Sequence, residues 1–251
     1  MVDTPMTVGR GARRVICLHG WFGSSAGWGG WPDLLDGDAF TYAFTDYRGY
    51  GRRRDERGDY SLEEIATDTL AAADALGWSE FSLVGHSMGG TAMQRVYTQA
   101  PDRVEAMVGI SPVPATGVPF DEDGWALFSG AAEQDDYRYA IIDFTTGNRL
   151  SPVWLRQMVG HSIDGSTREA VGGYLNAWAK TDFSAEIAGS KVPVKVVVGE
   201  HDPALGAPVM EQTFLDHYPN ADLEVLANAG HYAMFETPVA LATSVEAFLR
   251  R

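Results

Sequence analysis

The chain has 251 residues, enough for one large domain with a buried core, and 45% of them are hydrophobic, a normal share for a globular protein. Its formal net charge of −15 repels phosphate backbones and anionic membrane surfaces, so we expect no nucleic-acid or membrane partner. No apolar stretch reaches the roughly 18 residues of a membrane span, and the first 14 residues lack the pattern of a secretory signal peptide. Cys17 is the only cysteine, which excludes an intrachain disulfide and favours a reducing, cytoplasmic location.

Short apolar runs alternate with helical patterns along most of the chain, which predicts a mostly parallel sheet covered by helices. The first half should contain strands over residues 15–18 and 40–45, a helix over 61–76, a strand over 81–84, a helix over 89–100 and a strand over 104–110. Ser61 and Glu64 have the capping-box spacing at the start of the first helix, so we expect Glu64 to reach back to the N-cap. The chain therefore begins as a regular α/β alternation.

Residues 113–183 interrupt this alternation because they contain no convincing strand. About 70 residues are too many for a bare loop in a compact domain. We therefore expect a helical insertion, or lid, over residues 113–183, inserted into a core domain made of residues 1–112 and 184–251. The alternation then resumes with a strand over 194–198, a helix over 207–217, a strand over 223–226 and a last helix from Thr237.

The sequence Gly85-His86-Ser87-Met88-Gly89 follows the third expected strand and opens a helix, which is the context that a G-x-S-x-G nucleophile elbow requires. A serine at the centre of such a sharp turn is strained, and the two glycines omit side chains that would clash. The turn would hold the Ser87 hydroxyl at the carboxyl end of the sheet, above a helix N-terminus that favours negative charge. Ser87 is therefore our candidate nucleophile, against the alternative of a tight glycine turn with an incidental serine.

A serine hydroxyl needs a base within hydrogen-bond reach and a third group that orients the base. Of the six histidines, His231 lies directly after the sixth expected strand, in a loop that should face the elbow, while His201 is the weakest rival base. Asp202 follows the fifth strand and is the candidate orienting acid, with Glu200 as the runner-up. The order Ser87, Asp202, His231 along the chain is the one expected when the serine lies on an elbow of this kind.

Acyl transfer develops negative charge on the former carbonyl oxygen, where each preorganised N–H group contributes roughly 3 kcal/mol. One donor should be the N–H of Met88, directly after the nucleophile. The other should come from residues 19–23 after the first strand, where we favour Trp21 over Phe22. We expect His19 to hold this loop and His86 to point away from the pocket or into packing.

At these motifs the chain resembles the α/β-hydrolase family in its lid-bearing, esterase-like branch. The matching motifs are His19-Gly20-Trp21, Asp46-Tyr47-Arg48-Gly49-Tyr50-Gly51, the elbow around Ser87, Gly199-Glu200-His201-Asp202, and Gly230-His231. The resemblance implies that Ser87, Asp202 and His231 form a catalytic triad and that the amides of Trp21 and Met88 form the oxyanion hole. It also implies a twisted sheet, helices on both of its faces, and an enzyme without cofactor or metal that acts through an acyl-serine intermediate. Because fewer than 15 residues precede the first parallel strand, the sheet should be trimmed to about seven strands.

Aromatic residues of two regions are candidates for substrate binding: Trp21 and Phe22 in the first loop, with Phe128, Phe144 and Trp154 in the insertion. They predict a largely apolar pocket, and no Arg or Lys lies in a motif position to pair with a substrate carboxylate. We therefore expect the hydrolysis of small to medium uncharged carboxylic esters. The same triad would serve a lactonase, a cofactor-free perhydrolase or a carbon–carbon bond hydrolase, and the fold could also serve a non-catalytic small-molecule receptor. A homo-oligomer is compatible with the sequence.

Overall fold

The computed structural model describes residues 5–251 and contains a seven-stranded sheet in the order β1-β3-β2-β4-β5-β6-β7. Six strands run parallel: β2 (Arg13–Leu18), β3 (Phe40–Phe44), β4 (Phe81–His86), β5 (Val104–Ile110), β6 (Val194–Gly199) and β7 (Ala221–Leu226). Every residue of β4 and β6 is buried, as parallel strands covered on both faces require. Residues 1–4 lie outside the residues that the structure describes. Two of the expectations above, the core domain over residues 1–112 and the lack of a signal peptide, include these four residues.

The seventh strand, β1 (Met6–Gly9), pairs antiparallel with β3 at the edge of the sheet, with Met6 opposite Phe44. Three of its four residues are exposed and the fourth is half-buried. The apolar pattern therefore missed this strand, because an edge strand with little buried surface carries no apolar alternation. The expected fold of about seven mostly parallel strands is confirmed.

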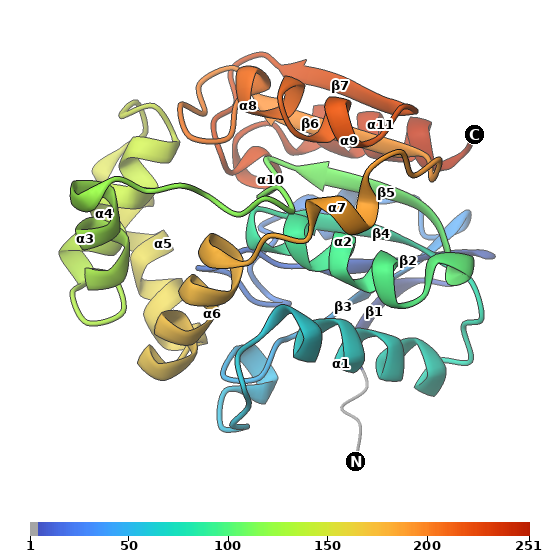
Figure 1. Ribbon diagram of the computed structural model, residues 1–251, viewed down its shortest axis with the longest axis horizontal. Helices are drawn as coiled ribbons and strands as arrows, with labels where there is room; N and C mark the ends of the chain where they lie inside the picture. The colour runs from blue at the N-terminus through green and yellow to red at the C-terminus, as the bar shows by residue number, and fades with distance from the viewer. Residues whose placement is uncertain (1–4) are drawn as a thin grey trace.

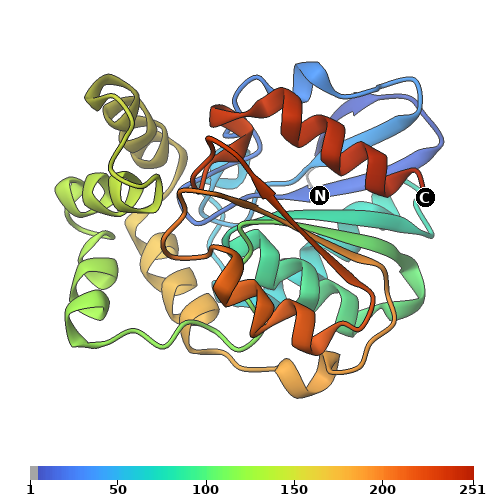
Figure 2. The ribbon, with the colours of Figure 1, turned by 90° about the horizontal axis from the view of Figure 1, so that it is seen from above.

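Helices cover both faces of the sheet (Figures 1 and 2). One face carries α1, α2 and α9, and the other carries α11 (Figure 2). The single helix expected over residues 207–217 is interrupted at Thr213, whose hydroxyl bonds back to the Val209 carbonyl. The helices of this part of the chain are α1 (Leu62–Ala75), α2 (Met88–Gln99), α8 (Ala207–Glu211), α9 (Phe214–His217), α10 (Ala233–Glu236) and α11 (Pro238–Leu249), with the short 3-10 turns η1 (Trp31–Leu34), η2 (Gly51–Arg53) and η3 (Pro101–Arg103).

The start of α1 follows the predicted capping pattern only in part. The Ser61 hydroxyl accepts the N–H of Glu64 at 3.1 Å, as expected of an N-cap. The Glu64 carboxylate does not return to Ser61. It accepts the N–H groups of Asp59 at 2.8 Å and Tyr60 at 3.2 Å, so it binds the two residues that precede the N-cap rather than the N-cap itself.

The chain between β5 and β6 forms helices, of which α3 to α6 gather beside the carboxyl ends of the strands at the left of Figure 1, while the short α7 lies beside α2. This segment is helical, as expected, and within it the structure records one isolated β-bridge, between Ser166 and Tyr50 of the core. The division into a core of residues 1–112 and 184–251 and a lid of residues 113–183 stays a prediction. The helices are α3 (Glu122–Gly130), α4 (Asp135–Thr145), α5 (Pro152–Gly165), α6 (Arg168–Lys180) and α7 (Ser184–Ile187).

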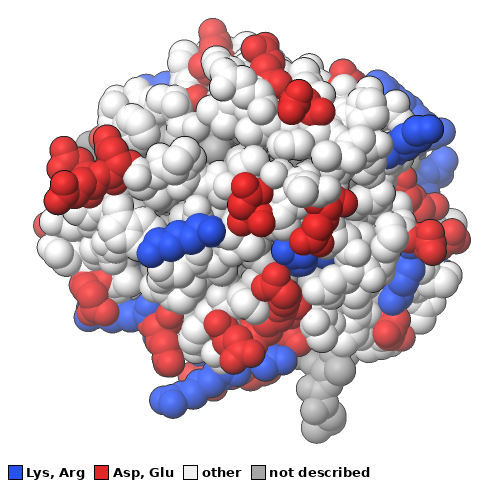
Figure 3. Space-filling view, in the orientation of Figure 1, with Lys and Arg blue, Asp and Glu red and all other residues white. Residues whose placement is uncertain are grey.

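Charged side chains of both signs are interspersed over the face of the molecule in Figure 3. Within residues 5–251, no helix has the length and apolar character that a membrane crossing needs.

Candidate active site

Ser87 lies in the turn between β4 and α2 with a left-handed backbone (φ 53°, ψ −118°), which is rare for a residue with a side chain. The turn is tight enough to require its glycines. A Cβ on Gly85 would lie 2.2 Å from the Gly89 carbonyl oxygen, and a Cβ on Gly89 would lie 2.1 Å from that of Leu18. The Ser87 N–H donates to the Ile110 carbonyl at 3.0 Å, which ties the turn to β5. The surrounding strands therefore hold the strained conformation in place.

His231 and Asp202, which follow β7 and β6, meet at the same edge of the sheet. The His231 Nδ1 lies 2.7 Å from the Asp202 Oδ2, and the Asp202 side chain is 0% exposed. The other oxygen, Oδ1, accepts the N–H groups of Ala204 and Leu205, each at 3.0 Å. Burial alone would raise the pKa of Asp202, but His231 and the hydrogen bonds to the carboxylate lower it below its usual value. An ionised Asp202 holds the His231 proton on Nδ1, which leaves Nε2 as the basic nitrogen.

The rival acid and base lie apart from this pair. The Glu200 side chain is 51% exposed and accepts the N–H of Asn228 at 3.0 Å. His201 is also exposed, with its Nε2 3.8 Å from the Glu200 carboxylate. Ser87 and His231 both line one cavity, whereas Glu200 and His201 are absent from the described residues of its wall. The geometry thus groups Ser87, His231 and Asp202 and separates them from both rivals.

The loop after β2 lies directly against the nucleophile. A Cβ on Gly20 would lie 2.7 Å from the His86 Nδ1 and 3.1 Å from the Ser87 Cβ, so only glycine allows this approach. The Gly20 carbonyl accepts the N–H of Gly23 at 2.9 Å and the Nδ1–H of His19 at 2.8 Å. Because C=O and N–H point in opposite directions in a trans peptide, these bonds also fix the direction of the Trp21 N–H. The second predicted donor, Met88, is the first residue of α2, where N–H groups have no partner within the helix.

Two tyrosine hydroxyls hold the carbonyl side of the same loop. Tyr47 donates to the His19 carbonyl at 2.9 Å, and Tyr50 donates to the Trp21 carbonyl at 2.8 Å. The Trp21 indole N–H donates to the Val171 carbonyl of α6 at 2.8 Å. The loop is therefore fastened both to the turn after β3 and to the insertion.

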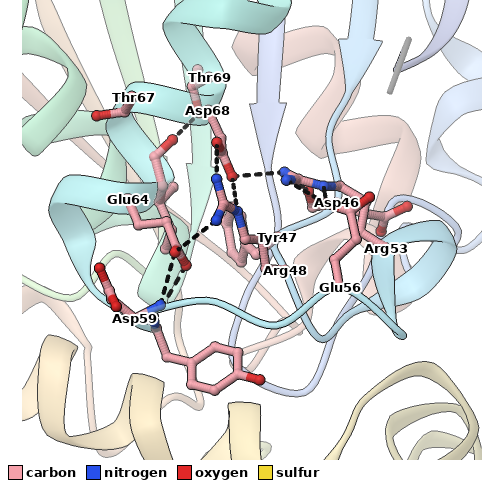
Figure 4. Close-up of polar contacts among 12 residues, drawn as sticks. Asp46, Tyr47, Arg48, Arg53, Glu56, Asp59, Glu64, Thr67, Asp68 and Thr69 are labelled. Carbon is pink, nitrogen blue, oxygen red and sulfur yellow. Dashed lines mark hydrogen bonds and ion pairs between the residues drawn. The ribbon is translucent and has the colours of Figure 1, made fainter. Parts of the chain in front are cut away.

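Ion pairs fasten that turn to α1 (Figure 4). Arg48 binds the Asp68 carboxylate through two hydrogen bonds of 2.9 Å and approaches Glu64 at 3.3 Å. Arg53 lies 2.9 Å from the same Asp68 and 2.8 Å from Glu56. A bidentate arginine–carboxylate pair within a network fixes geometry better than an isolated surface pair does. Tyr47 and Tyr50 are thus presented from a rigid base.

Ser87 and His231 open into a cavity of about 100 Å³ whose wall is mostly apolar. The Trp21 ring stacks on Phe22 and Phe128, with ring centroids 4.3 and 5.8 Å away, and meets the edge of Trp178 at 5.5 Å. The wall comes from the loops after β2, β4, β6 and β7 and from the insertion, and its residues are His19, Gly20, Trp21, Phe22, Gly23, Ser24, Gly27, Trp28, His86, Ser87, Val113, Val118, Phe120, Phe128, Ile141, Thr145, Met158, His161, Trp178, Ala204, Leu205, His231, Tyr232 and Phe235.

Two predicted substrate-binding residues, Phe144 and Trp154, do not line the described wall of this cavity. Phe144 is 44% exposed, because the buried face of α4 carries Ile141 and Thr145 and turns Phe144 outward. The Trp154 ring lies 5.9 Å from that of Tyr232, which does line the cavity. Trp21, Phe22 and Phe128 do line the cavity.

Five aromatic residues of the described wall were not named as substrate-binding from the sequence: Trp28, Phe120, Trp178, Tyr232 and Phe235. The sequence does contain a pattern that predicts the burial of Trp178. Val171, Tyr174 and Leu175 precede it at helical spacing, and all four are buried on one face of α6. Phe120 lies in the connection before α3, outside any periodic pattern.

His86 is packed, as expected, but at the cavity wall rather than away from it. Its Nε2–H donates to the His231 carbonyl at 3.0 Å, and the two rings are 4.9 Å apart. Burial, with the nearby His231 as the second cause, lowers the pKa of His86 to about 3. His86 therefore stays neutral and ties β4 to the loop of the candidate base. No three His, Cys, Asp or Glu side chains within residues 5–251 cluster in a way that could hold a metal ion.

Comparison with known proteins finds relatives along almost the whole chain. The chain is 26% identical to pimeloyl-[acyl-carrier protein] methyl ester esterase from Serratia marcescens, over 97% of this chain and 96% of that protein. It is 25% identical to 3-oxoadipate enol-lactonase 2 from Acinetobacter baylyi, over 82% and 77% of the two chains. The fold matches that of an esterase from Exiguobacterium antarcticum with a TM-score of 0.87 at 16% identity, covering 98% of this chain and 94% of that one. The family model described as alpha/beta hydrolase fold matches residues 13–238, and the chain therefore belongs to the α/β-hydrolase family.

Proposed function

We propose that the protein is a carboxylic ester hydrolase that uses Ser87 as nucleophile, His231 as general base and Asp202 as the residue that orients the base. The observation that carries this proposal is the 2.7 Å contact between His231 Nδ1 and Asp202 Oδ2, with His231 and Ser87 in the wall of one cavity. The similar esterase from Serratia marcescens, alignable over nearly the whole chain, supports the same reaction class.

The first half of the reaction transfers the acyl group to the enzyme. The Ser87 Oγ attacks the ester carbonyl carbon while its proton passes to His231 Nε2. The carbonyl oxygen becomes an oxyanion, which the N–H groups of Trp21 and Met88 stabilise. The tetrahedral intermediate then breaks the bond to the alcohol oxygen, and His231 returns the proton to the leaving alcohol. The product of this half is an acyl-Ser87 ester.

The second half repeats these steps with water. His231 takes a proton from water, whose oxygen attacks the acyl carbon, and the bond to Ser87 Oγ breaks. The proton returns to Ser87 and the acid leaves. Throughout, the ionised Asp202 keeps the His231 proton on Nδ1 and stabilises the imidazolium that forms.

The cavity indicates which esters fit. About 100 Å³ is smaller than the roughly 150 Å³ of an engineered protein cavity that holds benzene, so a short acyl group fits best. The aromatic wall of Trp21, Phe128 and Trp178 gives no charged partner to a substrate carboxylate. We therefore propose small uncharged esters as substrates, with the helices of residues 113–183 acting as the lid over the cavity.

A p-nitrophenyl ester series with acyl chains of increasing length tests this proposal on the purified protein. We expect turnover to be highest for the short acyl groups and to be abolished by Ser87→Ala. Mass spectrometry of the quenched reaction should show one acyl group on the peptide that contains Ser87. Turnover by Ser87→Ala at the wild-type rate would overturn the proposal, as would the absence of hydrolysis across the whole series.

Lactone hydrolysis is a second candidate, because it forms the same acyl-serine from a cyclic ester. The similarity to the enol-lactonase from Acinetobacter baylyi favours it over perhydrolysis and over a non-catalytic receptor. A panel of lactones run beside the p-nitrophenyl series separates lactonase from esterase, since a lactonase should have the higher kcat/KM on the cyclic esters.

A cytoplasmic location and a homo-oligomer remain part of the proposal. The single buried cysteine, Cys17, is compatible with a reducing compartment. Light scattering on the purified protein would give the oligomeric state.

A further inference from the structure

One buried carboxylate holds the loop of His231 from both sides. Glu236, the last residue of α10, accepts the N–H of Gly230 on Oε2 at 2.8 Å and the N–H of Tyr232 on Oε1 at 3.1 Å. Its side chain is only 3% exposed. The two carboxylate oxygens thus bind the residues immediately before and after the candidate base.

A cation from the insertion closes on this carboxylate. Arg149, in the connection between α4 and α5, forms an ion pair with Glu236. The same Nη2 atom donates to the carbonyl of Asn228, near the start of the His231 loop, at 3.0 Å. A buried carboxylate needs such a partner, because loss of one member leaves an uncompensated charge. Arg149 therefore holds Glu236 in place.

The backbone of His231 itself is held from two other elements. Its N–H donates to the carbonyl of Thr145, the last residue of α4, at 3.1 Å, and its carbonyl accepts the Nε2–H of His86 at 3.0 Å. The insertion also packs directly on the loop, since a Cβ on Gly230 would lie 2.8 Å from the Cα of Thr146. The peptide groups that aim the imidazole are thus bound to β4, to α10 and to the insertion.

We propose that Glu236 is a positioning residue for His231 and that Arg149 fixes Glu236, so that an ion pair links the insertion to the loop of the base. The inference rests on the proposed function. Glu236 is absent from the described cavity wall, and it acts by fixing the peptide groups on either side of His231. A displacement of about 1 Å in a catalytic group can cost roughly 100-fold in rate. Loss of Glu236 should therefore lower kcat and leave KM unchanged.

Glu236→Gln tests this proposal with the smallest change of shape. Glutamine has one acceptor oxygen and one NH2 donor, so it can accept only one of the two N–H groups and presents a donor to the other or to Arg149. We expect kcat for a p-nitrophenyl ester to fall roughly 10- to 100-fold. Arg149→Met should lower kcat to a similar extent. Arg149→Lys, which keeps a positive charge at this position, should retain much of the wild-type kcat. The double variant Glu236→Gln/Arg149→Met should lose less than the product of the two single losses, because both act through one contact.

Glu246 on α11 offers a matched control. Its carboxylate also accepts a backbone N–H, that of Asp36 at 2.7 Å, and also pairs with an arginine, Arg250 at 3.1 Å. Its side chain is 12% exposed, and none of these residues lines the described cavity wall. Glu246→Gln should lower the thermal midpoint to a similar extent while kcat stays at the wild-type value.

A readout without substrate separates this inference from the proposed function. The proton shared by His231 and Asp202 should give a low-field imidazole N–H resonance. We expect Glu236→Gln to shift or broaden it and Glu246→Gln to leave it unchanged. Wild-type kcat and an unchanged resonance in Glu236→Gln would overturn the inference even where Ser87→Ala abolishes turnover. If Glu236→Gln fails to fold, wild-type kcat and an unchanged resonance in Arg149→Met would overturn the inference instead. An enzyme that is inactive on every ester would refute only the proposed function.

Discussion

Replacement of Asp202 by asparagine exchanges one oxygen for NH2, and the structure determines which one. Oδ1 accepts two backbone N–H groups, from Ala204 and Leu205, whereas Oδ2 accepts, from the described part of the chain, only the Nδ1–H of His231. An NH2 group at the Oδ1 position would face two donors and lose two buried hydrogen bonds, each contributing about 1 kcal/mol. In Asp202→Asn the amide oxygen therefore stays with the backbone, and the NH2 group faces His231.

This orientation places the histidine proton on the wrong nitrogen. An NH2 group 2.7 Å from His231 Nδ1 can only donate, so Nδ1 must accept and the proton moves to Nε2. A protonated Nε2 of a neutral imidazole cannot take the Ser87 proton. We expect kcat to fall about 10⁴-fold, which corresponds to roughly 5 kcal/mol of activation free energy. The shape of the side chain is retained, so the fold should be retained as well.

The assay is kcat/KM for p-nitrophenyl butyrate, with the thermal midpoint as the measure of folding. Glu200→Gln is the matched control, because Glu200 is exposed and its carboxylate contacts only the Asn228 N–H and the exposed His201 ring among the contacts described. It should keep the wild-type rate. If Asp202→Asn retained more than about one-tenth of the activity, control of the tautomer by Asp202 would be refuted. Loss of activity in Glu200→Gln instead would transfer the orienting role to Glu200.

Three further changes test other parts of the site. Tyr50→Phe removes the hydroxyl that donates to the Trp21 carbonyl, and the loss of this one hydrogen bond should lower kcat/KM for a p-nitrophenyl ester about tenfold. An unchanged kcat/KM would show that this hydrogen bond does not hold the loop in its active position. Trp178→Ala enlarges the cavity, so the variant should prefer longer acyl groups than the wild type does, and it should lose roughly 3–5 kcal/mol of stability. An unchanged chain-length preference would mean that the acyl group does not bind beside Trp178. His86 has a pKa of about 3 in the folded protein and about 6.5 in the unfolded chain, so between these pH values the unfolded chain binds a proton that the folded protein does not. The free energy of unfolding should therefore fall by up to about 1.4 kcal/mol per pH unit as the pH is lowered from 6 to 4. Chemical denaturation at several pH values should show a shallower pH dependence of this free energy in His86→Gln than in the wild type.

The residues that local chemistry fixes were predictable from the sequence. Gly85 and Gly89 frame a turn that other residues could not adopt, and the strand before it and the helix after it locate that turn at the carboxyl end of the sheet. Asp202 and His231 each lie in the loop that follows a strand, β6 ending at Gly199 and β7 at Leu226, so the parallel order of the strands brings them to the same edge. Short-range pattern and strand direction together are sufficient for this part of the site.

The cavity wall depends on contacts that pattern does not contain. Phe144 and Thr145 are neighbours in the sequence, yet only Thr145 faces the cavity, because the rotation of α4 is set by its packing on other helices. The pair of Arg149 and Glu236 joins residues 87 positions apart and has no local signature. Aromatic content could therefore predict an apolar pocket but not which rings form it.

The neutrality of the neighbouring histidines follows from the same contacts. His19 donates from Nδ1 to the Gly20 carbonyl and accepts the Tyr47 N–H on Nε2, so it needs the neutral ring. Burial lowers the pKa of His19, with Asp46 and the Gly20 carbonyl partly offsetting it, and burial also lowers the pKa of His86. A charged His86, with its ring 4.9 Å from that of His231, would oppose the charge that His231 must acquire in the reaction. Burying these two imidazoles while satisfying their hydrogen bonds therefore leaves His231, paired with Asp202, as the one of the three that can take the serine proton.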